Sequence, residues 1–395
     1  MQEIECVNQL LIALFGVKFM RQSFISVVSL IVFLYMIWAF SVFAEPPFPD
    51  MDQWQKTDFS AHSVPLEDMI EGGPGKDGIQ SIDAPEFEST SKAAKWLNEN
   101  EPVIAFIVNG KAKAYPLQIL MYHEIVNDQL GDQKIAVTYC PLCNAAMIFS
   151  RSYSYEDFDF GTTGKVYTSN LVMYDRQSET WWLQFTGEAV VGEYTGKSLE
   201  LLPSQIVSFE HFKNNYPDGL VLSRNTGFDK KYGVNPYTHY DSRSIPIGWF
   251  FRKPFDDRLP AMERVLGVAT TNEAMAFPFS SLNTQPLVHT DIGEEKILVI
   301  SKPGVASSMD KLLIHESKDV LAAAAYSRVV GNRVLDFEVR QGKIIDKQTE
   351  SSWNMFGVAE QGELAGTRLT KIDRGVYFSF VWLDFYPQSV IFGSR

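Results

Sequence analysis

The chain has 395 residues, a formal net charge of −13 and a hydrophobic content of 45%. This length allows two or three domains, and the composition excludes a largely disordered chain. The acidic balance argues against nucleic acid as a partner, because phosphate binding requires a basic surface. The 28 Phe, 16 Tyr and 8 Trp residues favour a β-rich core, since large rings pack well on pleated sheets.

Residues 1–44 predict a signal peptide or a membrane anchor. Lys18 and Arg21 precede an uncharged apolar run over residues 22–44. Val42-Phe43-Ala44 suits a signal peptidase, but the run is also long enough to span a bilayer, so cleavage and anchoring remain alternatives. In both cases the rest of the chain is expected outside the cytoplasm: periplasmic, secreted, or held at the membrane by residues 22–44.

The remaining chain divides into four predicted segments. Residues 45–102 form a polar lead-in whose Gly- and Pro-rich stretch at 71–78 indicates a loop. Residues 103–223 form a first unit that opens with two strands around Asn109-Gly110, a strong hairpin signal. Ser204 is expected to cap a helix that ends near Asn215. An aromatic connector rich in Pro and Gly follows over residues 224–264, and residues 265–395 form a second unit.

The two units are related by an internal repeat. Val103–Pro141 aligns without a gap on Val265–Pro303, and a second block pairs Asp175–Glu179 with Asp346–Glu350. Two copies are too few for a solenoid, so the sequence predicts two duplicated β-rich units packed as a pair. The expected fold class is α+β, predominantly β.

Comparison of the two copies separates candidate chemistry from structure. Cys140 and Cys143 are the only cysteines besides Cys6, and His123 precedes them. All three are replaced in the second copy, by Lys302, Val305 and Gln285 respectively. The carboxylates of the Asp175 block recur instead, which indicates a capped turn.

The strand pattern relates His123 to the cysteines. A turn centred on Gly131-Asp132 would place Gln129 opposite Lys134, and His123 opposite Cys140. Residues that face each other in an antiparallel pair have Cβ atoms roughly 5 Å apart. The spacing therefore predicts that His123 and Cys140 share one site.

The leading hypothesis is a soft-metal site for copper or zinc, because two thiolates and an imidazole suit Cu(I) or Zn(II). Such a protein would bind the metal outside the cytoplasm, with a redox role or a role in metal delivery to an unidentified protein partner. Candidates for a fourth ligand are Met147, Met173, His239 and His211.

Three other interpretations of the cysteines remain open. Cys-Pro-x-Cys after a strand suits thiol–disulfide chemistry, and a Cys–His nucleophile would make the protein a cysteine-dependent enzyme. The third alternative is a simple structural disulfide in an interaction or structural protein. A c-type haem is disfavoured, because Asn144 stands where that motif needs His. Tyr139, Ser169 and Asn170 are candidates for a pocket beside the thiols.

The motifs resemble the bacterial domain-of-unknown-function family thirty-one seventy-nine, over roughly residues 70–395. The resemblance is carried by Tyr139–Cys143, His123–Asn127, Ser169–Arg176 and the tyrosines of 232–240. Asn144 departs from the Gly that the family usually has after the second Cys. The family implies no established activity, so the resemblance supports the site and leaves its function open.

Overall fold

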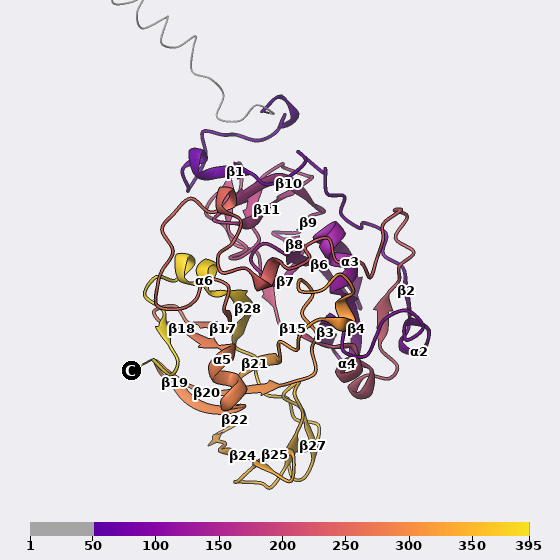
Figure 1. The fold of residues 1–395 in the computed structure, drawn as a ribbon, viewed down its shortest axis with the longest axis vertical. Helices are drawn as coiled ribbons and strands as arrows, with labels where there is room; N and C mark the ends of the chain where they lie inside the picture. Colours follow the sequence, from indigo (N-terminus) through magenta and orange to yellow (C-terminus); the bar gives the residue numbers. More distant parts are fainter. Residues whose placement is uncertain (1–50, 395) are drawn as a thin grey trace, which may run out of the picture. The chain divides into compact units, whose positions relative to one another are not determined.

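The computed structural model of the protein describes residues 51–394, and the predicted signal or anchor segment at 1–44 lies outside them (Figure 1). Across these residues the protein is mostly β, with several sheets and short helices. None of the helices in this range is long and apolar enough to cross a membrane.

The first sheet has the order β15-β3-β4-β16-β2. Its strands are β2 (Phe87–Ser89), β3 (Pro102–Val108), β4 (Lys111–Pro116), β15 (Ser204–Ser208) and β16 (Leu220–Leu222), with helices α2 (Thr90–Ala93) and α4 (Phe209–Asn215). The predicted hairpin is present, with Asn109 and Gly110 both at positive φ between β3 and β4. The helix predicted from Ser204 is wrong at its start: Ser204 lies in β15, and the Ser208 side chain caps α4.

The second sheet, β14-β7-β6-β5, carries the cysteines. It contains β5 (Ile125–Leu130), β6 (Gln133–Cys140), β7 (Ala145–Ser150) and β14 (Leu201–Leu202), and helix α3 (Leu117–His123) leads into it. Gln129 pairs with Lys134 as the turn predicted, and the ladder runs to Ile125 opposite Thr138.

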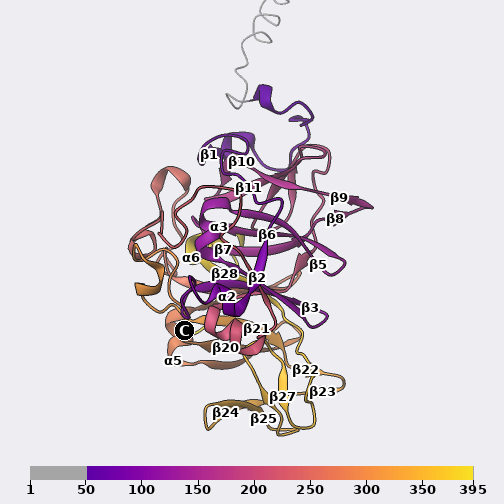
Figure 2. The same cartoon turned by 90° about the vertical axis from the view of Figure 1, so that its right-hand side faces the viewer.

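A third sheet, β1-β10-β11-β12-β13, lies beside this one (Figures 1 and 2). It comprises β1 (Met69–Glu71), β10 (Phe160–Tyr167), β11 (Asn170–Asp175), β12 (Trp181–Leu183) and β13 (Ala189–Val191), and the hairpin β8 (Ser152–Tyr153)–β9 (Glu156–Asp157) precedes it. The predicted lead-in, residues 45–102, is therefore part of the fold, because it supplies β1 and β2 as edge strands of two sheets.

The second half of the chain builds three further sheets, ordered β28-β17-β18-β29, β19-β20-β21 and β24-β25-β26-β27, and the pair β22–β23. Their elements are β17 (Arg264–Ala269), β18 (Ala274–Pro278), α5 (Phe279–Thr284), β19 (Leu287–Ile292), β20 (Glu295–Lys302), β21 (Ala322–Ser327), β22 (Val329–Val330), β23 (Arg333–Val334), β24 (Phe337–Arg340), β25 (Lys343–Asp346), β26 (Ser352–Trp353), β27 (Ala359–Gln361), β28 (Asp373–Phe378), α6 (Ser379–Phe385) and β29 (Val390–Ile391). Single 3-10 turns lie at 51–53, 66–68, 240–242, 248–250 and 314–316.

The largest apolar core joins both halves of the chain around the cysteine turn. Cys140 and Cys143 are buried in the same cluster as Tyr377 and Trp382 of the second half. The Phe185 and Phe385 rings stack with centroids 4.1 Å apart. Burial of apolar surface between the halves stabilises both, and it fixes the environment of the thiols.

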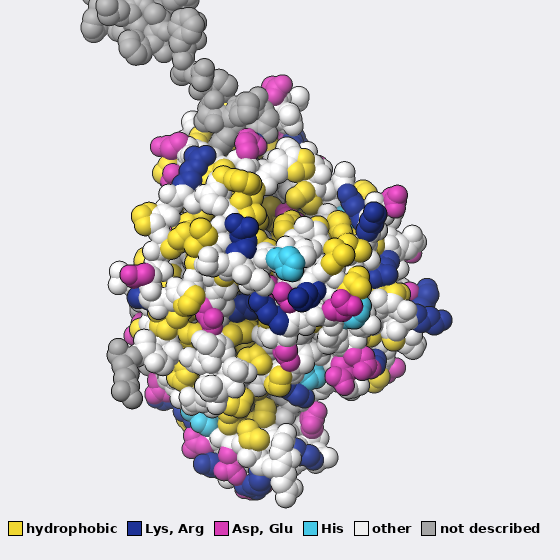
Figure 3. All heavy atoms as spheres, viewed as in Figure 1, with side chains coloured by type: hydrophobic (Ala, Val, Ile, Leu, Met, Phe, Trp, Pro, Cys, Tyr) yellow, Lys and Arg dark blue, Asp and Glu magenta, His cyan; other side chains and the backbone are white. Residues whose placement is uncertain are grey.

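The surface around β24, β25 and β27 differs from this core. Acidic and basic side chains are interspersed there, toward the bottom of the view in Figure 3. Arg340 is half-exposed and forms ion pairs with Glu338 and Glu350. Such exposed pairs contribute little to stability, so this region is suited to control substitutions.

Candidate functional site

The cysteines occupy the tight turn that joins β6 to β7. Cys140 is the last residue of β6 and pairs with Ala145, the first residue of β7. Asn144 closes the turn at a φ of 56°, a left-handed conformation that asparagine adopts more readily than most residues. Both thiols are free and buried, and they interact with each other across the turn.

A second turn, between β10 and β11, lies directly against the thiols. Thr168 and Ser169 both have positive φ, at 52° and 59°. The Ser169 carbonyl oxygen accepts a hydrogen bond from the Cys140 sulfur at 3.5 Å. The Asn170 side-chain amide donates to the Cys143 sulfur at 3.2 Å. Left-handed non-glycine residues carry strain that packing must compensate, and such positions cluster at functional sites.

The predicted pocket residues thus divide between two sides of the turn. Ser169 and Asn170 face the sulfurs, whereas the Tyr139 hydroxyl points toward the second half. That hydroxyl lies 3.0 Å from the Ser308 hydroxyl and donates to the Asn144 side-chain oxygen at 3.2 Å. Tyr139 therefore ties the turn to the second half of the chain.

Glu124 is a site residue that the sequence reasoning missed. It caps α3 at a φ of 57°, and its carbonyl oxygen accepts from the Tyr139 backbone N–H at 2.8 Å. Its side chain is buried, and burial raises the pKa of the carboxyl to about 8. Glu124 aligns with Pro286 in the second half, so the same comparison of copies could have identified it.

The electrostatic environment of Cys140 disfavours a resting thiolate. Burial raises the pKa of the Cys140 thiol well above its ordinary value, and the Cys143 thiol and the Glu124 charge add to this shift. Proton removal from Cys140 therefore requires a nearby acceptor or a change in its surroundings.

Cys140 and Glu124 line a small cavity of about 170 Å³. Its walls are mostly apolar, with Leu171 and Phe250 among them, and Lys165 adds a buried cation whose Nζ lies 2.7 Å from a Glu71 carboxylate oxygen. The cavity is large enough for a small organic group. Cys143 is not among its lining residues, so Cys140 is the thiol that a bound molecule would meet.

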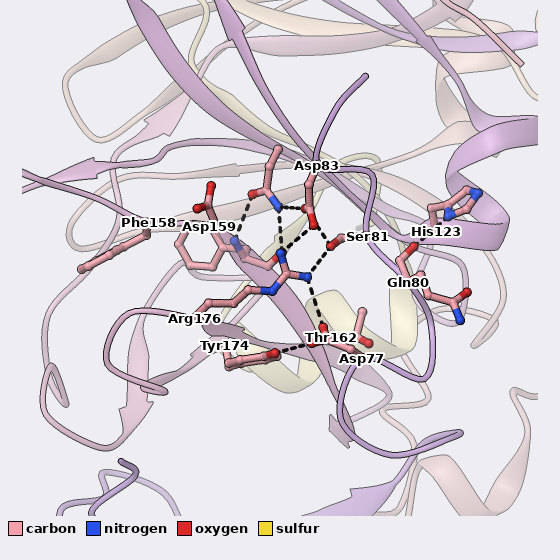
Figure 4. A network of polar contacts seen from close by, with 12 residues as sticks. Asp77, Gln80, Ser81, Asp83, His123, Phe158, Asp159, Thr162, Tyr174 and Arg176 are labelled. Carbon is pink, nitrogen blue, oxygen red and sulfur yellow. Dashed lines mark hydrogen bonds and ion pairs between the residues drawn. The ribbon is translucent and has the colours of Figure 1, made fainter. Parts of the chain in front are cut away.

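His123 does not join the cysteines, and the prediction that it faces Cys140 is wrong. The residue ends α3, before the ladder of β5 begins. Its Nδ1 lies 2.7 Å from the Gln80 carbonyl oxygen, and its Nε2 lies 2.5 Å from the Tyr232 hydroxyl. Figure 4 shows the ring directed at the loop around Gln80.

The same loop is held from its other side by Arg176. Figure 4 shows this side chain among the carboxylates of Asp77 and Asp83 and the Ser81 hydroxyl. The guanidinium donates to Asp83 at 2.7 Å and to Ser81 at 2.9 Å. Because Gly72, Gly73 and Ile79 line the cysteine cavity, this network positions one wall of it.

The candidate fourth metal ligands are distributed over several elements. The Met147 sulfur accepts from the Tyr377 hydroxyl at 3.1 Å, and Met173 is buried in β11 opposite Trp182. His239 precedes the turn at 240–242 and has a φ of 62°, while His211 lies in α4. Within residues 51–394, no three His, Cys, Asp or Glu side chains come together as a metal site. The two thiols lie together on the turn between β6 and β7.

Fold and site together define a mostly β protein with a buried pair of thiols on one tight turn. The model of the family described as "Protein of unknown function (DUF3179)" matches residues 76–389, and the chain belongs to this family. Searches of curated proteins and of solved structures gave no match.

Proposed function

We propose that Cys140 and Cys143 form a dithiol–disulfide redox site that exchanges electrons with a thiol or disulfide bound in the adjacent cavity. The supporting observation is that the two thiols interact on one turn and that, of the two, only Cys140 lines the cavity. This arrangement separates an attacking thiol from a resolving thiol.

The proposed exchange has two steps, one for each thiol. The Cys140 thiolate attacks one sulfur of a bound disulfide, the S–S bond breaks, and the released thiolate takes up a proton. Cys143 then attacks the mixed disulfide at the Cys140 sulfur and expels the second thiol. The protein gives up two electrons and two protons, and the substrate disulfide becomes two thiols.

Two side chains assist these steps in the proposal. In its ionised form, the Glu124 carboxyl beside Cys140 acts as the proton acceptor that a buried thiol needs, and a pKa of about 8 keeps part of it ionised near neutral pH. Asn170 donates to the Cys143 sulfur and thereby stabilises negative charge on it.

A second candidate function is the binding of copper or zinc by the two thiolates, with a role in redox chemistry or metal delivery. It is supported by the adjacency of the two sulfurs on the turn, which two-coordinate Cu(I) requires. His123 would contribute only after breaking its contacts with Gln80 and Tyr232.

The domain organisation is also part of the proposal: two duplicated units, 103–223 and 265–395, of which only the first retains the site. The order β3-β4-α3-β5-β6 recurs as β17-β18-α5-β19-β20. In both, the second strand pairs in parallel with a late strand, β16 or β29. We place the protein outside the cytoplasm, as the N-terminal sequence suggests, where either thiol function would operate.

One preparation tests both functions. The chain from residue 45 is purified without chelator, equilibrated in glutathione buffers of defined potential, and labelled with a maleimide for mass spectrometry. Two labels that disappear together at one midpoint support the redox site, and Cys140→Ser should abolish that transition. Elemental analysis of the same sample measures copper and zinc, with Cys140→Ser/Cys143→Ser as the control. A pair that remains a disulfide at every potential and binds no metal would sink both proposals.

A further inference from the structure

We infer that the protein has a second binding site, a cavity of about 470 Å³ that takes a small organic anion with an apolar body. The cavity lies where β14 and β15 of the first half meet residues 368–374, which include the start of β28. It shares no lining residue with the cysteine cavity, so the inference is independent of the thiol proposal.

The cavity wall carries a local excess of positive charge. Arg368, Lys371 and Arg374 line it, against the single acidic side chain of Asp373. Lys371 and Asp373 form an ion pair with each other, which leaves two guanidinium groups. In a chain with a net charge of −13, such a concentration of cations around one hollow is unexpected for an ordinary solvated face.

Neither guanidinium has a carboxylate partner among the described residues. Arg368 donates only to neutral oxygens, the Tyr216 hydroxyl at 3.2 Å and the Phe356 carbonyl at 3.4 Å. The Nε of Arg374 is buried, and no group in residues 51–394 accepts a hydrogen bond from it. A buried N–H without an acceptor costs free energy. An anion in the cavity would place its charge beside two guanidinium groups that have no carboxylate partner among the described residues.

The shape and the remaining walls define the ligand further. Arginine presents a planar fork of donors that matches a carboxylate or a phosphate ester. Ile107, Leu202, Leu369 and Ile372 provide an apolar wall for the rest of the molecule. Small-molecule sites typically have volumes of about 300–1,000 Å³, with a few polar groups among apolar ones. The cavity meets this description.

Isothermal titration calorimetry tests the inference. The sample is the chain purified in the form that an expressing cell produces. The probes are octanoate and octyl phosphate, which combine a charge with an apolar body, 1-octanol, which has the body alone, and inorganic phosphate, which has the charge alone. We expect saturable binding of one or both amphiphilic anions, at least about tenfold tighter than that of octanol or phosphate. Whichever of octanoate and octyl phosphate binds more tightly shows whether the site prefers a carboxylate or a phosphate ester.

Substitution then locates the site. Arg374→Gln should weaken binding of the amphiphilic anion at least about tenfold, whereas Arg340→Gln on the distant surface should not change it. Thermal denaturation shows whether each variant is folded, and the comparison of probes on the unsubstituted protein needs no variant. Three results would overturn the inference. The first is that neither amphiphilic anion binds, and the second is that both bind no more tightly than octanol or phosphate. The third is that a folded Arg374→Gln variant binds them as tightly as the unsubstituted protein.

Discussion

The side-chain amide of Asn170 donates to the sulfur of Cys143 at 3.2 Å, although 26 residues separate the two in the chain. The amide cannot rotate freely, because its oxygen accepts from the Phe185 backbone N–H at 2.9 Å and its nitrogen also donates to Gln184 at 2.8 Å. The hairpin of β10 and β11 therefore positions a donor against a thiol on the turn between β6 and β7. This fixed donor favours the reduced state, in which the sulfur can carry negative charge.

The first prediction concerns this donor. Asn170→Ala should make the proposed couple more reducing by roughly 20–40 mV, because loss of one hydrogen bond to sulfur destabilises the dithiol relative to the disulfide. The midpoint is measured by maleimide labelling in glutathione buffers. Asn354→Ala, which removes a side-chain amide far from the sulfurs, is the control. An unchanged midpoint in a folded Asn170→Ala variant would show that the contact has no influence on the redox chemistry.

The second prediction follows from the raised pKa of Glu124. This carboxyl has a folded pKa of about 8, above its ordinary value near 4.5. The folded state therefore holds a proton that the unfolded state releases, so stability falls as the pH rises from about 4.5 to 8. Glu124→Gln should remove this loss. Relative to the unsubstituted protein, it should gain up to about 4 kcal/mol of unfolding free energy at pH 8.5 and little at pH 5.

Chemical denaturation at these two pH values measures the effect. Glu263→Gln serves as the control, because it makes the same change at a carboxyl that is less buried than that of Glu124. Equal stability differences at both pH values for Glu124→Gln would mean that water reaches this carboxyl and that it ionises normally.

Part of the site was predictable from local sequence. The Cys-x-x-Cys turn and the register of β5 and β6 follow from strand pattern and turn position, and the observed ladder matches the expected pairing from Gln129 to Ile125. The predicted register was wrong before Ile125, because it extended the strand back through His123. Glu124 takes a left-handed conformation there, and no glycine or asparagine signalled it.

The remaining walls of the site were beyond sequence reasoning. Lys165, Phe250 and Gly72 meet Cys140 at one cavity from three distant parts of the chain. Such contacts depend on how the sheets pack, which periodicity does not reveal. The helix predicted from Ser204 failed for a local reason: Ser208 is an equally good cap, and pairing with β3 drew residues 204–208 into a strand.

The third prediction compares two buried carboxylates. Asp175 accepts from the Trp182 indole N–H at 2.9 Å, and Asp346 does the same for Trp353, also at 2.9 Å. Ser178 and Thr349 complete the two turns in the same way. Because each substitution leaves a buried indole N–H unpaired, Asp175→Ala and Asp346→Ala should each cost about 2–4 kcal/mol of unfolding free energy.

Denaturant titration gives these two values, and thiol labelling gives the midpoint of the proposed couple. We expect similar costs and unchanged midpoints for both variants. A shift of the midpoint in Asp175→Ala alone would assign Asp175 a part in the chemistry instead of the purely structural role that the two matching turns indicate.

The last prediction separates His123 from the thiols. Since its ring bonds to the Gln80 carbonyl oxygen and the Tyr232 hydroxyl, His123→Gln should leave the redox midpoint and any bound copper or zinc unchanged. The same substitution should cost about 1–3 kcal/mol at pH 7.5, through imperfect replacement of two buried hydrogen bonds. Loss of metal or a shifted midpoint would return His123 to the site.

The pH dependence of His123→Gln provides an independent check. Burial lowers the pKa of His123 below its ordinary value of 6.5, so below that pH the unfolded state binds a proton that the folded state resists. The unsubstituted protein therefore loses stability as the pH falls through about 6.5, and this part of the loss is absent in the glutamine variant. The stability difference between the two proteins should narrow from pH 7.5 to pH 5.5. A difference that stays constant would mean that His123 titrates normally, and that the ring exchanges with solvent instead of anchoring the loop over the cysteine cavity.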